Sequence, residues 1–130
     1  MYDRPSLVEL VTSVRDFIER TAAPKLEGHA AFHARVAVNA LGIVERQLQQ
    51  APEAEAQELA RLRALLGHDG GLEELNRELC ARIRAGELGL ATPGLAEHLR
   101  ATTFAKLAVD QPKYSTFVRA LAARPPDTRR

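Results

Sequence analysis

Hydrophobic residues recur at helical spacing along most of the chain, and this pattern predicts α-helices. The first stripe of this kind lies in residues 6–23 and consists of Leu7, Leu10, Val11, Val14, Phe17 and Ile18. Ser6 and Glu9 have the spacing of a capping box, in which each side chain accepts a hydrogen bond from a backbone N–H group at the helix start. We therefore expect a first helix that begins at Ser6 and is stopped by Pro24.

Residues 28–50 predict a second helix that is apolar around most of its circumference. One apolar row contains Phe32, Val36, Ala40 and Ile43, and the next contains Ala37, Leu41, Val44 and Leu48. A helix with so much apolar surface is either central in the fold or half-covered by a partner. We therefore expect a homodimer, held together by an isologous contact between helices.

Four shorter helices are predicted after the second one. They cover residues 52–66, 72–85, 93–109 and 112–122. Pro52 suits the first turn of the third helix, and Thr92 followed by Pro93 suits the start of the fifth. Gly86 suits the position that follows the last turn of the fourth helix.

These elements predict an all-α fold, because no segment alternates at the period of two that is typical of a strand. We expect a single-domain bundle of five to six helices, with the second and fifth helices at its centre. The bundle would cover residues 1–123, and residues 124–130 would form a flexible C-terminal tail.

Composition narrows the classes of protein to which the chain can belong. Its 130 residues fit one domain, and the formal net charge of +1 points to neither nucleic acid nor a membrane surface as a partner. Cys80 is the only cysteine, which fits a reducing compartment. No signal peptide is recognisable, and no segment has the ~18 uninterrupted apolar residues of a membrane span. We expect a cytoplasmic protein.

Polar residues interrupt the two most apolar helices, and these positions predict the candidate site. Arg35 and Asn39 lie on the second helix, while Lys106, Asp110 and Tyr114 lie on or just after the fifth. If the two helices pack together, these side chains share one cluster that can bind a small anion such as a phosphate or a carboxylate. The same groups can instead neutralise one another, Lys106 with Asp110 or Arg35 with Asp110, and fix the register of the helices.

No constellation for catalysis or metal binding is recognisable in the sequence. His29 and His33 are four residues apart, but Ala30 stands where the zinc-protease pattern needs a glutamate. An all-helical chain cannot build the strand–turn–helix elbow of a serine nucleophile, and no glycine-rich phosphate loop is present. We therefore expect no catalytic residue, no metal and no cofactor.

Four segments resemble a small bacterial family of unknown function: "MYDRP", "FHARVAVNALGIVERQL", "ELNRELCARIRAGEL" and "HLRATTFAKLAVDQPKYS". The resemblance covers nearly the whole chain, and the last segment is the most specific. It implies an all-helical cytoplasmic protein without an assigned activity. Genes of this family often lie near aminoglycoside-phosphotransferase-like kinases and acyl-CoA dehydrogenases, which implies an accessory role.

Two functions follow from the sequence. The first is a non-enzymatic accessory or interaction protein that acts through a helical surface, beside a small-molecule kinase or an acyl-CoA enzyme. The alternative is a small-anion or acyl-group binding protein, or an enzyme for such a ligand, that uses the polar cluster between the second and fifth helices.

Overall fold

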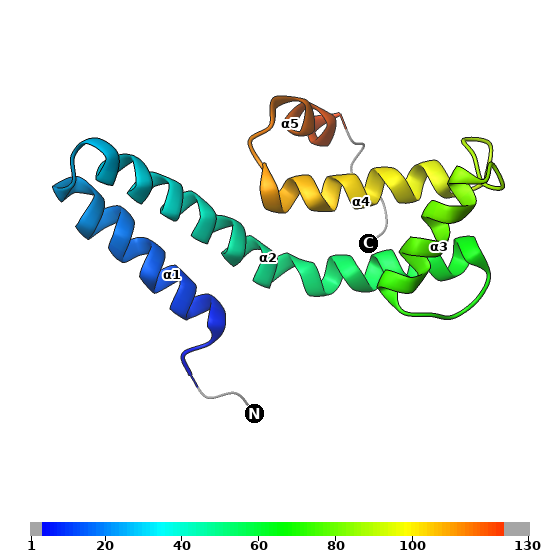
Figure 1. Ribbon diagram of the computed structural model, residues 1–130, viewed down its shortest axis with the longest axis horizontal. Coiled ribbons are helices and arrows are strands. Elements are labelled where there is room, and N and C mark those ends of the chain that lie inside the picture. Colours follow the sequence, from blue (N-terminus) through cyan, green and yellow to red (C-terminus); the bar gives the residue numbers. More distant parts are fainter. Residues whose placement is uncertain (1–3, 124–130) are drawn as a thin grey trace. The chain divides into compact units, whose positions relative to one another are not determined.

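The computed structural model describes residues 4–123, and the regular structure in this range is entirely helical (Figure 1). The helices are α1 (Leu7–Phe17), α2 (Gly28–Leu66), α3 (Leu72–Arg84), α4 (Leu95–Asp110) and α5 (Ser115–Ala122). Residues 4–123 contain no strand, so the prediction of an all-α fold is confirmed. The expected C-terminal tail, residues 124–130, lies outside the described residues.

The single helix α2 occupies the place of two predicted helices. The helix continues through Pro52, although proline has no N–H group to donate to the carbonyl four residues earlier. The predicted break between residues 28–50 and 52–66 was therefore wrong. The chain nevertheless divides at this proline into two compact units, Met1–Pro52 and Glu53–Arg130. Each unit is described by itself below.

The first unit is a helical hairpin of α1 and the N-terminal part of α2 (Figure 1). The capping box is confirmed: the Ser6 N–H donates to the Glu9 carboxylate at 2.7 Å, and the Glu9 N–H donates to the Ser6 hydroxyl at 3.3 Å. The α-helix ends at Phe17, earlier than expected. A π-helical turn (Ile18–Ala22) and a 3₁₀ turn (Ala23–Lys25) then reverse the chain.

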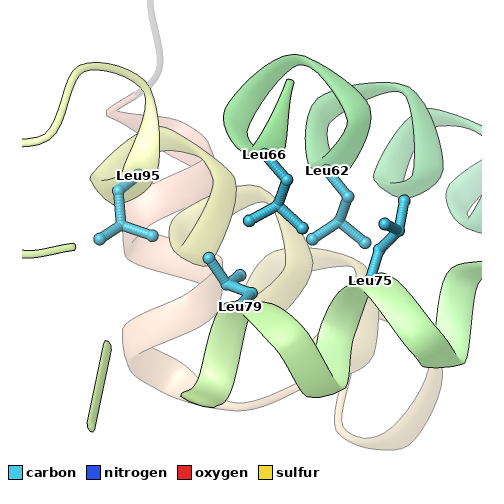
Figure 2. Close-up of a cluster of buried hydrophobic side chains, with 5 residues drawn as sticks. All are labelled: Leu62, Leu66, Leu75, Leu79 and Leu95. Atoms are coloured by element: carbon cyan, nitrogen blue, oxygen red, sulfur yellow. The ribbon is translucent and has the colours of Figure 1, made fainter. Parts of the chain in front are cut away.

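The hydrophobic core of the second unit is a cluster of five leucines from three helices. Leu62 and Leu66 come from α2, Leu75 and Leu79 from α3, and Leu95 from the start of α4. Leu62 and Leu66 point toward Leu75 and Leu79, with Leu95 to one side of them (Figure 2), and each of the five is at most 7% exposed. The position of this core differs from the expectation that residues 28–50 form the centre of the fold, since it draws on α2 only near its C-terminal end.

The ends of the helices follow local sequence signals only in part. Gly86 follows α3 with a φ of 75°, a left-handed conformation that glycine adopts without steric cost, as predicted. Thr92 was expected to cap α4, but its hydroxyl accepts a hydrogen bond from the Gly89 N–H at 3.0 Å. Gly94 takes the N-cap position instead, with a φ of 83°. The helix therefore begins two residues later than predicted.

Candidate functional site

The five residues of the predicted polar cluster lie in two groups. Arg35 and Asn39 are one turn apart on α2 in the first unit, and both are exposed. Lys106 and Asp110 are one turn apart on α4 in the second unit, and Tyr114 is the N-cap residue of α5. These three are exposed as well. Because the groups belong to different units, a cluster that joins all five residues stays a prediction.

The neutralising network is not seen within either unit. The expected ion pair between Lys106 and Asp110 does not form, and no hydrogen bond or ion pair links any of the five side chains to another residue of 4–123. Exposed charged side chains that form no ion pair contribute little free energy to the packing of one helix against another. The alternative in which these groups fix the packing of the helices therefore has no support within the units.

A different polar residue, His98, lies at the inner face of α4. Its side chain is 2% exposed, which makes it the one buried polar residue among residues 4–123. Burial lowers the pKa of His98 because an apolar environment disfavours the charged imidazolium. The positive charge of Arg61 on α2 lowers this pKa further, and the negative charge of Glu58 offsets part of the effect. His98 is therefore neutral near pH 7.

Several polar atoms around His98 lack a hydrogen-bond partner. His98 Nδ1, Thr102 Oγ1 and Arg61 Nε are all buried, and none of them has a partner in the described part of the chain. Glu58 is held more firmly, because Asn76 on α3 donates to its carboxylate at 2.8 Å. No hydroxyl, thiol or carboxylate of residues 4–123 is hydrogen-bonded to His98, and these residues form a polar layer beside the leucine core.

The sequence showed only half of this polar layer. His98 and Thr102 are four residues apart and interrupt an apolar helix, two turns and one turn before the predicted site residue Lys106. Glu58 and Arg61 were missed. Their signal was available: they stand three residues apart and flank the leucine face that contains Leu62. Charges beside a predicted core face indicate a polar contact at the edge of that core.

The first unit presents an exposed row of large hydrophobic side chains on α1. This row, the α1 stripe, consists of Leu7 (68% exposed), Leu10 (48%), Val14 (51%) and Phe17 (59%). The polar side of α1 contacts α2 instead: Thr12 donates a hydrogen bond to Glu45 at 2.7 Å, and Arg15 forms an ion pair with the same carboxylate. The polar residues Thr12 and Arg15 are thus partly buried, as are Val11 and Ile18 of the predicted apolar row, whereas the other four members of that row are exposed.

Two other kinds of site are absent from the described residues. The rings of His29 and His33 stack with their centroids 6.4 Å apart, and both side chains are exposed. Within residues 4–123, no group of three or more histidines, cysteines or carboxylates is placed to hold a metal ion. None of the helices described there combines the length and the apolar character that crossing a membrane requires.

Comparison with known proteins gives a family without an assigned role. The family described as "Domain of unknown function (DUF6285)" matches residues 24–114, which include parts of both units. No curated protein and no solved structure matches the chain. Since the match covers more than half of the 130 residues, the chain belongs to the DUF6285 family.

Proposed function

We propose that this protein is a non-catalytic interaction protein that associates with a second copy of itself through the α1 stripe. The observation that supports this most strongly is the outward orientation of four large apolar side chains of α1. Its hydrogen-bonding side is directed at Glu45 on α2, and its four large apolar side chains are between 48% and 68% exposed.

The free energy of burial favours covering this stripe. Full burial of a valine, leucine or phenylalanine side chain contributes roughly 1.5–3 kcal/mol, so four such side chains contribute on the order of 5 kcal/mol even when half covered. The first unit has little core of its own, because only Ala34 and Gly42 are buried among residues 4–52. An additional apolar contact would therefore stabilise this unit.

The spacing of the stripe fits another helix as the partner. Its members are separated by three, four and three residues, which is the a/d spacing of helices that pack with side chains interleaved. A flat or irregular protein surface does not require this periodicity. The partner surface is therefore expected to be a helix with a similar apolar row.

A second copy of α1 meets this requirement. The positions beside the stripe hold Val11, Ser13 and Ile18, so the edges of the contact carry few charges that would repel an identical helix. Residues 4–52 carry six basic and five acidic side chains, a net charge of +1 that opposes self-association only weakly. Two-fold dimers are also the commonest assemblies of soluble proteins.

Sedimentation equilibrium of the wild-type chain and of single variants tests this proposal. The wild type is expected at twice the 14.3 kDa of the chain, and Val14→Asp at the mass of one chain. Leu90→Asp is the matched control, because Leu90 is 88% exposed and lies outside the stripe. It should remain dimeric.

Circular dichroism should give equal helix content for the three proteins, since both substitutions are at exposed positions. Leu10→Lys provides a second disruption of the same surface with the opposite charge. A wild type that stays monomeric at high concentration contradicts the proposal. So does a Val14→Asp variant that dimerises as strongly as Leu90→Asp.

A further inference from the structure

A groove of about 860 Å³ lies in the second unit between α2, α4 and α5. Most of its wall is hydrocarbon. It is formed by Phe104, Phe117 and Leu121 together with six alanines: Ala54, Ala101, Ala105, Ala108, Ala120 and Ala123. The volume is within the range of about 300–1,000 Å³ that is usual for small-molecule sites. Because alanine side chains are small, they leave room for an apolar chain.

The charged residues of the groove are gathered toward one end of α4. Glu97 and Arg100 line it there, and Arg61 of α2 lines the groove as well. The α4 residues that follow in the lining, from Ala101 to Ala108, are all apolar and extend over about 10 Å of helix. The groove therefore has a charged end and an apolar run.

The charge at this end is not neutralised. Neither Arg61 nor Arg100 forms an ion pair with another residue of 4–123, and Arg61 Nε is buried without a hydrogen-bond partner. Glu97 is the one carboxylate in the lining, so two positive charges face one negative charge. The carboxylate of Glu58 is already bonded to Asn76.

The neighbouring His98 does not change this balance. It is 2% exposed, and both its burial and the charge of Arg61 lower its pKa, so it is neutral near pH 7. A neutral imidazole forms no ion pair with the guanidinium group of Arg61 and adds no positive charge. An excess of one positive charge remains beside an apolar surface.

We propose that this groove binds an amphipathic carboxylate of the fatty-acid class. The carboxylate head would lie against Arg61 and Arg100, because guanidinium groups form strong charge-assisted hydrogen bonds with carboxylates. The hydrocarbon chain would lie along the alanine side chains of the groove. Each methylene group that is removed from water in this way favours binding. The site belongs wholly to the second unit and uses other residues than the α1 stripe, so it is independent of self-association.

Isothermal titration calorimetry of the full chain with laurate, below the concentration at which laurate forms micelles, tests this site. Laurate is expected to bind with one molecule per chain, and octanoate more weakly because its chain is shorter. Acetate, which offers only the head group, should give no measurable binding. Dodecyltrimethylammonium has a chain of the same length and the opposite charge, so it should not bind either.

Three variants locate the site. Arg100→Gln removes an exposed charge and should weaken laurate binding about tenfold or more. Ala105→Phe fills the groove and should abolish binding, whereas Ala96→Phe, at an exposed position of the same helix outside the groove, should leave the affinity unchanged. The monomeric Val14→Asp variant should bind laurate as the wild type does.

Two results would overturn the inference. Equal binding of laurate and dodecyltrimethylammonium would mean that the arginines do not select the head group. Unchanged laurate affinity in both Ala105→Phe and Arg100→Gln would mean that the ligand lies elsewhere.

Discussion

Thr12 on α1 donates a 2.7 Å hydrogen bond to Glu45 on α2, across 33 residues of sequence. The Glu45 carboxylate also pairs with Arg15, and its side chain is only 14% exposed. One carboxylate thus holds two polar groups of α1 against α2. This contact leaves the α1 stripe facing outward.

Replacing Glu45 by alanine should loosen α1. The substitution removes the partner of Thr12 and one of the two carboxylate partners of Arg15, and leaves both side chains partly buried, at a cost of about 1–3 kcal/mol. Hydrogen exchange of the α1 amides should become faster than in the wild type. Glu55→Ala is the matched control, because Glu55 is exposed on the same helix and has no partner within residues 4–123. Equal exchange rates in the two variants would show that the Glu45 contact does not hold α1.

Replacing Pro52 by alanine should stabilise the protein. Pro52 is exposed inside a continuous helix, where proline is ~3 kcal/mol less favourable than alanine. The alanine N–H can restore the bond to the carbonyl of Leu48. Urea denaturation should therefore give a higher midpoint for Pro52→Ala than for the wild type. A lower midpoint would indicate that the chain breaks at this proline, as the sequence had suggested.

The stability of the second unit should fall on acidification because of His98. Its folded-state pKa lies below the ordinary value of 6.5, owing to burial first and to Arg61 second, with Glu58 acting in the opposite direction. As the pH falls below 6.5, the unfolded chain therefore binds a proton before the folded chain does. The free energy of unfolding decreases from that pH downward, until the pKa of the folded state is passed.

A His98→Leu variant isolates this effect. Urea midpoints of the variant and the wild type should differ in their dependence on pH between about pH 7.5 and pH 5.5, with the steeper loss in the wild type. His68 acts with the opposite sign, because the Asp69 carbonyl and then Glu78 raise its pKa, so its stabilisation is present at low pH and is lost as the pH rises. It is unchanged in both proteins. Parallel pH profiles would mean that His98 is not buried as described.

The helical class of the fold followed from the sequence because the spacing of apolar residues depends on local backbone geometry. The capping box at Ser6 and the glycine at position 86 are equally local, and both were predicted correctly. The continuity of α2 was not predicted, because one proline weakens a helix without always ending it.

The α1 stripe and the groove of the second unit were harder to predict, because they depend on which faces of the helices pack against one another. An amphipathic pattern does not reveal that the polar side of α1 packs on α2 through Thr12 and Glu45. The groove of the second unit needs three helices in place before Arg61 of α2 and Arg100 of α4 line it together. His98 on α4 lies close enough to Arg61 on α2 for the charge of Arg61 to lower its pKa, and the sequence alone does not show this proximity.

The most direct measurement of the central claim is cross-linking at the α1 stripe. In a Cys80→Ser background, which removes the only native cysteine, Val14→Cys places one thiol within the stripe, and Leu90→Cys places one at an exposed position outside it. With a short flexible bis-maleimide we expect a covalent dimer of the Val14→Cys protein and unlinked chains of the Leu90→Cys protein. Cross-linking of Leu90→Cys as efficient as that of Val14→Cys, or no cross-linked Val14→Cys dimer at all, would contradict a contact between α1 stripes.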